Sequence, residues 1–188
     1  MDQTTCRDFG ARALAVLLPV LTLPVSTLIV STLLVLALLG GPASVQAQTR
    51  PDDCSDLYTA KLYPVALPAC QTQADAKDTS AQFTLGLMYY FGQGTVQDYA
   101  KAFIWFKRAA KAGHLGAQNN VGYFYFNGHS VPQDYLRAYV WFSLAASSGY
   151  NEAARYRDMA ASKLTPDVRI QGQGMATACS NSKFEMCE

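Results

Sequence analysis

Residues 81–114 read AQFTLGLMYYFGQGTVQDYAKAFIWFKRAAKAGH, and residues 117–150 read AQNNVGYFYFNGHSVPQDYLRAYVWFSLAASSGY. The two stretches align without a gap at a spacing of 36 residues and are identical at 14 of 34 positions. A repeat period of about 20–50 residues is typical of a solenoid, in which each unit buries its apolar face against the next. We therefore predict a helical solenoid, whose extended surface suits binding better than catalysis.

Each repeat is predicted to fold as two helices that are joined by a glycine-rich turn. Small and apolar residues recur at helical spacing over 79–91, so this segment is expected to form the first helix of the first repeat. Asp98 is placed to cap a second helix over 99–112, because its carboxylate can accept the free N–H groups of the first turn. The second repeat follows the same scheme, with helices over 115–126 and 135–148.

A degenerate half-repeat precedes the two complete repeats, over residues 48–78. Several of its alanine and tyrosine residues keep the 36-residue register. Pro64 and Pro68 fall inside it, and an interior proline removes a backbone hydrogen bond and clashes with the preceding turn of a helix. We therefore expect the helix of this segment to be short or kinked.

Residues 151–188 begin a third unit that changes character. Arg157 and Asp158 stand where the complete repeats carry an apolar residue and a glycine, and polar residues suit the outer face of a terminal cap. Thr165 is followed by a proline, which is favoured at the first position of a helix, so a last helix is expected to run to about residue 178. The repeat array is thus predicted to end in capping helices and a tail.

The first 47 residues have the features of a secretory signal. Arg7 and Arg12 precede a charge-free, leucine-rich stretch over 13–39, and the small residues around Ala47 suit a cleavage site. We expect cleavage after Ala47, which places the rest of the chain in the periplasm or outside the cell. The apolar stretch is also long enough to cross a bilayer, so the alternative is an uncleaved anchor that holds the protein at the inner membrane, facing the periplasm.

The charges of the predicted mature chain are balanced. Removal of 1–47 leaves 13 basic and 12 acidic residues, with no basic run. Such a chain lacks the electrostatic footprint of a nucleic-acid-binding protein. We therefore expect a protein or peptide partner and no nucleic acid, and contact with a membrane only through the N-terminal segment if that segment is retained.

Four cysteines remain after the predicted cleavage, whereas Cys6 lies in the segment that is removed. An even number of cysteines in an exported chain indicates disulfide bonds, and four cysteines allow three pairings. We favour Cys54–Cys70 and Cys179–Cys187, because each pair brackets one end of the repeat array, where a terminal unit has a single neighbour. The spacings of 16 and 8 residues differ from the close cysteine pairs of zinc sites, so no metal site is expected.

The repeated pattern resembles the Sel-one-like repeats, which are relatives of the tetratricopeptide repeat. The family pattern has an alanine, Leu-Gly, a tyrosine, a Gly-x-Gly-Val turn, an aspartate, a Lys-Ala-x-x-Trp-aromatic run, paired alanines and a glycine. The stretch 81–114 matches nearly every element, and the second repeat departs at Val121 and Ser130. The resemblance covers about 57–178 and implies an all-α, right-handed α/α solenoid. Members are typically exported scaffolds, which implies that this chain mediates protein–protein interaction in the bacterial envelope.

A cysteine-rich branch of the same family is described as β-lactamase-like. That branch carries a regularly spaced cysteine pair in each repeat, whereas both complete repeats of this chain lack cysteine. Its activity is therefore not carried over. A weak envelope hydrolase and a membrane-tethered assembly factor are kept as the alternatives to an interaction scaffold.

No catalytic constellation stands out, so we expect neither enzyme activity nor a cofactor. The chain lacks GxSxG, HExxH and GxxxxGK[ST] motifs. His114 and His129 lie beside turns without an acidic partner at fixed spacing, and both are expected to be exposed loop residues. Asp134 repeats the capping position of the first unit. Trp105 and Trp141 share the register of the buried alanines, which predicts that both belong to the core.

The side of the first helices that faces away from the repeat core is the candidate binding surface. First helices line the concave face in relatives of this repeat, where aromatic side chains would anchor a partner peptide or helix and amides would form hydrogen bonds. The residues of this candidate surface are Gln82, Phe83, Leu87, Tyr90, Asn119, Asn120, Tyr123 and Phe126. The alternative left open is that these side chains pack against the adjacent first helix.

Overall fold

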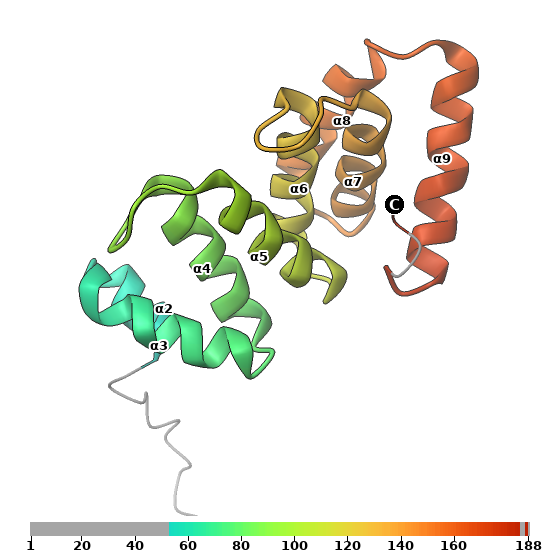
Figure 1. Cartoon of the computed structure of the whole chain (residues 1–188). Coiled ribbons are helices and arrows are strands. Elements are labelled where there is room, and N and C mark those ends of the chain that lie inside the picture. Colours follow the sequence, from blue (N-terminus) through green and yellow to red (C-terminus); the bar gives the residue numbers. More distant parts are fainter. Residues whose placement is uncertain (1–52, 185–186, 188) are drawn as a thin grey trace, which may run out of the picture. The chain divides into compact units, whose positions relative to one another are not determined.

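The computed structural model describes residues 53–184 and 187, which form eight α-helices (Figure 1). The helices are α2 (Cys54–Thr59), α3 (Tyr63–Asp75), α4 (Thr79–Phe91), α5 (Tyr99–Lys111), α6 (Leu115–Asn127), α7 (Tyr135–Ser147), α8 (Asn151–Ala161) and α9 (Pro166–Asn181). Within the described ranges, no helix combines the length and apolarity needed to cross a bilayer. The predicted signal segment, with its cleavage site after Ala47, lies outside the described residues.

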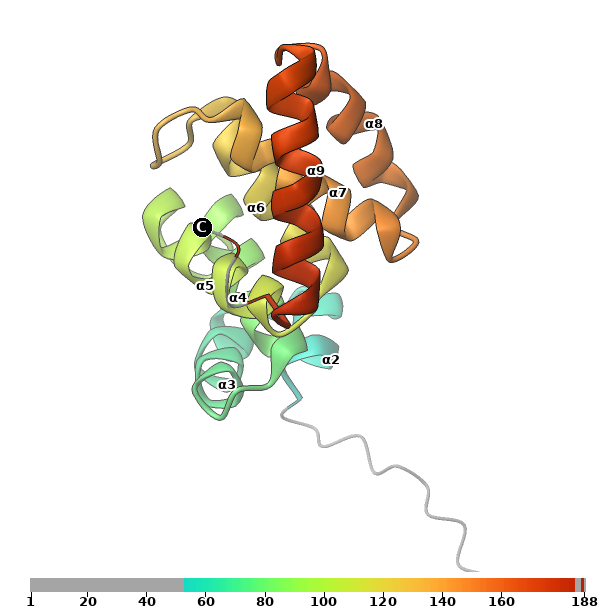
Figure 2. The same ribbon diagram turned by 90° about the vertical axis from the view of Figure 1, so that its right-hand side faces the viewer.

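The two complete repeats fold as matching helical hairpins, which confirms the predicted fold class. α4 pairs with α5 and α6 pairs with α7, and each helix of the second hairpin begins 36 residues after its counterpart. α5 packs against α6 and α7 packs against α8, so neighbouring units stack in sequence order (Figures 1 and 2). The described part of the chain is therefore an all-helical repeat stack with no strand.

A glycine in each first helix lets the second helix of the same hairpin approach closely. A Cβ atom on Gly86 would lie 2.6 Å from the ring of Phe106, and one on Gly122 would lie 2.8 Å from the ring of Phe142. Both distances are too short for carbon atoms that are not bonded. The two phenylalanines are almost fully buried, so each hairpin is held by a large ring seated against a bare backbone.

Asp98 and Asp134 cap the second helices, as predicted. An oxygen of Asp98 accepts the backbone N–H of Lys101 at 2.9 Å, and Asp134 accepts that of Arg137 at 2.9 Å. The hydrogen bond from Lys101 is the main cause that lowers the pKa of Asp98. The repeated aspartate of each unit therefore serves the same structural role, which is to satisfy free N–H groups at the start of the second helix.

α6 begins with a cap that the sequence reasoning missed. Nδ1 of His114 accepts the backbone N–H of Ala117 at 3.1 Å, and burial lowers the pKa of this histidine. His129 is also half-buried and stacks on Tyr123, with 5.8 Å between ring centroids. The expectation that both histidines are exposed loop residues is therefore wrong, because each ring packs on the aromatic side chains of a neighbouring helix.

The leading half-repeat forms α2 and a full-length α3. α3 has 13 residues, the same length as the helices of the complete repeats, and it continues through Pro68. Pro64 falls at its start, where a missing N–H costs no helical hydrogen bond. Of the two expected alternatives, a short or a kinked helix, the short helix is wrong, because the packing of buried Ala66 and Ala74 against α4 sustains the helix around a single interior proline.

Both disulfide bonds form as predicted. Cys54 is bonded to Cys70, with 4.6 Å between the Cα atoms, and Cys179 is bonded to Cys187, with 4.8 Å between them. All four residues are buried. Each bond therefore crosslinks one end of the repeat stack, where the second neighbour that a central repeat would have is missing.

The tryptophans belong to the core, as predicted, and each lies in a different hydrophobic cluster. Trp105 packs with the leading unit and α4, and Trp141 packs with the second repeat and the C-terminal helices. Their side chains are almost fully withdrawn from solvent. Neither ring is available as a stacking platform for a ligand.

α9 leaves the repeat pattern. A second helix of a third unit would form a hairpin with α8, but α9 packs on α7 (Figure 2). Asp158 replaces the hairpin glycine, and Ala178 stands one period after Phe142, so the ring-on-glycine contact is lost. Gly172 instead lets α9 approach α7, because a Cβ atom there would lie 2.8 Å from the ring of Tyr139.

Candidate functional site

A cleft of about 290 Å³ opens on the first-helix side of the repeats, between α4, α6 and the start of α8. Its lining residues are Leu87, Tyr90, Phe91, Phe106, Asn119, Asn120, Tyr123, Phe124, Tyr150, Glu152 and Tyr156. We call this the first-helix cleft. It is mostly aromatic, with two amides and one carboxylate among its polar groups.

The repeat geometry brings five of the eight predicted surface residues into this cleft. They are Leu87, Tyr90, Asn119, Asn120 and Tyr123. Leu87 and Tyr123 occupy equivalent positions in the two repeats, so stacking of the hairpins places them side by side along the cleft. All except Asn119 are partly exposed, so their side chains can be reached by a ligand.

The other three predicted residues serve the packing of the protein itself. The amide nitrogen of Gln82 donates to the carbonyl of Ala74 at 3.2 Å, which ties α4 to the end of α3. Phe83 stacks on His114, with 4.2 Å between ring centroids. Phe126 packs against Tyr135, with 5.3 Å between centroids. Phe83 therefore follows the alternative of packing against the adjacent first helix, whereas Gln82 and Phe126 contact α3 and α7 instead.

Sequence reasoning missed the contribution of the third unit. Tyr150, Glu152 and Tyr156 line one side of the cleft from the start of α8. Tyr156 lies one period after Asn120, so extending the same helix face by 36 residues would have found it. The polar residues of this unit indicate a cap, but one face of α8 continues the first-helix side of the repeats.

Ring contacts hold the tyrosines of the cleft in place. The ring of Tyr90 lies 5.8 Å from that of Phe124, and Tyr123 meets Tyr156 edge to face at 6.2 Å. Tyr156 in turn stacks on Phe142, 5.4 Å away. Such aromatic pairs add to the energy of simple burial, so the cleft is preorganised.

The pKa values of two tyrosines of the cleft, Tyr90 and Tyr150, are raised. Burial, with a smaller contribution from the neighbouring Tyr123 hydroxyl, raises the pKa of Tyr90. Burial is also the main cause that raises the pKa of Tyr150, followed by the charge of Glu152, whose carboxylate lies 3.5 Å from the Tyr150 hydroxyl. Tyr90 and Tyr150 therefore contribute polar but uncharged groups to the cleft at neutral pH.

Asn119 has a buried side chain with an unused acceptor. Its side chain is 7% exposed, and its Oδ1 atom has no hydrogen-bond partner among the described residues. An unpaired buried acceptor is costly, at about 1–3 kcal/mol. The wall of the cleft therefore includes a buried amide oxygen that has no hydrogen-bond partner among the described residues.

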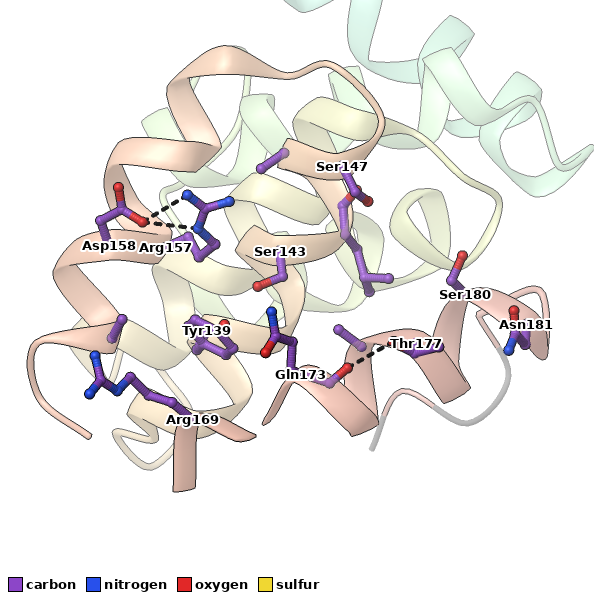
Figure 3. A pocket seen from close by; sticks show the side chains of 14 residues that line it. Tyr139, Ser143, Ser147, Arg157, Asp158, Arg169, Gln173, Thr177, Ser180 and Asn181 are labelled. Carbon is purple, nitrogen blue, oxygen red and sulfur yellow. Dashed lines mark hydrogen bonds and ion pairs between the residues drawn. The ribbon is translucent and has the colours of Figure 1, made fainter. Parts of the chain in front are cut away.

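A second groove, with more polar lining residues, lies between α7, α8 and α9, where α9 packs on α7 and forms no hairpin with α8. Its volume is about 710 Å³. Figure 3 shows the side chains that line it. Arg157 forms an ion pair with Asp158 at 2.8 Å, and the hydroxyl of Thr177 donates to the carbonyl of Gln173 at 3.0 Å. Several of its polar groups are thus used within their own helices. None of the predicted surface residues lies in it.

The described residues contain no group of three histidine, cysteine or acidic side chains placed to hold a metal ion. The four cysteines of this part of the chain are bonded in pairs, and His114 is engaged as a helix cap. The chemistry within reach of a ligand in the first-helix cleft is therefore recognition by aromatic, amide and carboxylate groups.

Comparison with known proteins agrees with this architecture. The family model described as Sel1 repeat matches residues 79–114 and 116–150. No curated protein matches the sequence significantly.

Two solved structures are similar to this chain. One is a protective antigen present in uropathogenic Escherichia coli strains and displaying an SLR fold, at 27% identity and a TM-score of 0.62 over 71% of this chain. The other is a Sel1 repeat protein from Oxalobacter formigenes, at 29% identity and a TM-score of 0.53 over 55% of this chain. The matches span only 28% and 43% of those two proteins.

Proposed function

The chain belongs to the Sel1-repeat family, and we propose that it is an exported scaffold that binds a protein partner in the bacterial envelope through the first-helix cleft. The observation that carries this proposal is the cleft itself. Preorganised aromatic side chains surround a buried, unpaired amide oxygen, which is the combination by which a protein surface anchors and orients a bound chain.

The disulfide bonds support export. Disulfides persist in oxidising compartments and are rare in the reducing cytosol. Cys54–Cys70 and Cys179–Cys187 are both formed between buried residues at the two ends of the repeat stack. An extracytoplasmic location follows from these bonds, and the periplasm is the compartment that we propose.

The proposed binding mode uses a short segment of the partner. A cleft of about 290 Å³ is too small for a folded domain to enter, but it accommodates one or two side chains of a protruding strand, loop or helix. Tyr90 and Tyr123 supply apolar contact area at low entropic cost, since their rings are already held by neighbours. Asn119 and Asn120 supply the hydrogen-bonding groups.

A pull-down from envelope extract tests this function. The bait is the disulfide-bonded protein, produced with its own N-terminal segment, and the variant is Tyr123→Ala in the cleft. Ile104→Ala is the matched control, because Ile104 is a half-exposed apolar residue of α5 that does not line the cleft. Circular dichroism verifies that both variants are folded.

We expect a stoichiometric partner that is recovered with the wild type and with Ile104→Ala, and lost with Tyr123→Ala. Recovery of the same partner by all three proteins would contradict the assignment of the first-helix cleft.

A further inference from the structure

The charge of the first-helix cleft is unbalanced, since its lining has one acidic residue and no basic one. Its polar side chains are two asparagine amides, four tyrosine hydroxyls and one carboxylate, and that carboxylate, of Glu152, is its one charged group. No lysine, arginine or histidine lines it. In a chain with almost balanced charge, this local absence of positive groups points to a ligand that brings the positive charge itself.

The side-chain oxygen of Asn119 lacks a hydrogen-bond donor. Its Oδ1 atom is buried and unpaired among the described residues, in a side chain that is only 7% exposed. An aliphatic side chain in the cleft would leave this oxygen unpaired and more deeply buried, and a carboxylate would present a second acceptor to it. An N–H donor is the group that satisfies it.

Two buried glutamines of the first helices also carry an amide oxygen that has no hydrogen-bond partner among the described residues. The amide nitrogens of Gln82 and Gln118 donate to the carbonyls of Ala74 and Ala110, at 3.2 and 3.3 Å, and tie each first helix to the preceding helix. Neither glutamine lines the cleft, whereas Asn119 does. Of these three unpaired oxygens, that of Asn119 is therefore the one whose side chain belongs to the wall of the cleft.

The tyrosine rings of the cleft suit a cation. Elsewhere in the described chain, cations already cover aromatic rings: Arg108 lies 4.4 Å over Trp105 and Lys101 lies 5.3 Å over Tyr89. No described lysine or arginine covers a ring of the cleft tyrosines, although the imidazole of His129 stacks on Tyr123. The negative faces of such rings attract ammonium and guanidinium groups, most strongly where water is partly excluded.

We propose that the first-helix cleft holds an arginine side chain of the bound protein, with its guanidinium against the cleft tyrosines and its N–H groups donating to Asn119 Oδ1 and the Glu152 carboxylate. This inference rests on the proposed function, because it names the chemistry by which the same cleft recognises its partner. A planar guanidinium suits this site better than an ammonium, since it can stack on a ring and donate in two directions at once.

Nuclear magnetic resonance titration of the disulfide-bonded protein tests the inference. The probes are Nα-acetyl-arginine methylamide, the corresponding citrulline compound, which is nearly isosteric but uncharged, and the corresponding lysine compound. The readouts are the side-chain amide signals of Asn119 and Asn120 and the backbone amide signal of Tyr123.

We expect saturable shifts of these signals with the arginine probe, with an affinity about tenfold higher than for citrulline, because the uncharged compound loses the attraction of the rings and of Glu152. The lysine probe should bind with intermediate affinity. Added salt should weaken the binding of the two charged probes and leave that of citrulline almost unchanged.

Glu152→Gln provides the matched variant, since Glu152 is exposed and its removal leaves the core intact. It should abolish most of the preference for arginine over citrulline. Asp167→Asn, at an exposed position in the first turn of α9 outside the cleft, should leave that preference unchanged. Equal affinities for arginine and citrulline, or the absence of any shift at Asn119 with the arginine probe, would overturn the inference.

The proposed function and the arginine inference can be tested separately, because each would fail in a different experiment. If the Tyr123→Ala variant loses the partner but arginine has no advantage over citrulline, the cleft binds a protein by another chemistry, and the arginine inference alone is wrong. If arginine binds at Asn119 while pull-down is unaffected by Tyr123→Ala, the cleft has the inferred chemistry but the proposed function is wrong.

Discussion

The imidazole of His114 stacks on the ring of Phe83, with 4.2 Å between the ring centroids, while its Nδ1 atom caps α6 by accepting the N–H of Ala117. One side chain thus joins two first helices and begins the second of them. The cap requires the neutral ring with a free lone pair on Nδ1. The junction between the two complete repeats is therefore sensitive to the protonation of a single histidine.

Stability should fall as the pH drops below the ordinary histidine pKa of about 6.5. Burial lowers the pKa of His114 in the folded protein, so the unfolded chain binds the proton more readily. The stabilisation is fully present above the unfolded pKa and is lost as the pH falls through the folded pKa. Urea unfolding at a series of pH values between neutral and mildly acidic measures this loss.

His114→Asn is the control for that titration, because asparagine keeps a capping acceptor and does not titrate. The difference in free energy of unfolding between wild type and variant should shrink or reverse as the pH falls. A constant difference across the pH range would show that protonation of His114 does not control the stability of this junction.

Gly122→Ala should destabilise the protein by about 1–3 kcal/mol, because the added Cβ would lie 2.8 Å from the buried ring of Phe142. Gly174→Ala is the matched substitution, since a Cβ atom there meets no atom within 4 Å in α9. It should be neutral or stabilising by up to about 1 kcal/mol, through helix propensity. Thermal or urea unfolding of the two variants measures both effects, and equal destabilisation would contradict the hairpin packing described above.

Removal of the first disulfide by Cys54→Ala with Cys70→Ala should lower the free energy of unfolding by about 2–4 kcal/mol. The bond closes a loop at the end of the repeat stack, where the leading unit has a single neighbour. Urea unfolding monitored by circular dichroism measures the loss, with fully reduced wild type as the reference. A variant as stable as the oxidised wild type would show that α2 and α3 do not depend on the crosslink.

The exported protein should begin at Gln48, since the small residues that end at Ala47 suit signal cleavage. Intact-mass measurement of the protein recovered from the producing cells determines its first residue. A protein that retains Met1 would contradict cleavage and favour the membrane-tethered alternative.

The repeat helices could be predicted closely because the residues that begin and end each helix occur in both repeats. α4 begins at Thr79 and ends at Phe91, as the pattern indicated, and the aspartate caps fall at the predicted residues. The cysteine pairing was also predictable, because each pair brackets one end of the array. Repetition and position in the chain carry this information without any knowledge of tertiary contacts.

The remaining features depend on contacts that have no local signature. Phe83 and Tyr90 belong to one predicted helix face. His114 stacks on Phe83, whereas Tyr90 lines the cleft. The packing of α9 on α7 follows from the loss of the ring-on-glycine contact between the two helices of a hairpin and from a new contact of this kind at Gly172. This change could not be predicted, because the third unit does not follow the pattern of the complete repeats.

We propose that a protein partner binds in the first-helix cleft. Site-specific photocrosslinking in living cells tests this binding site, with benzoylphenylalanine at Asn120 in the cleft and, as the control, at Ile104 on α5. We expect one discrete crosslinked protein from position 120 and none of that size from position 104. Crosslinks to the same protein from both positions, or from position 104 alone, would show that the partner does not bind in the cleft.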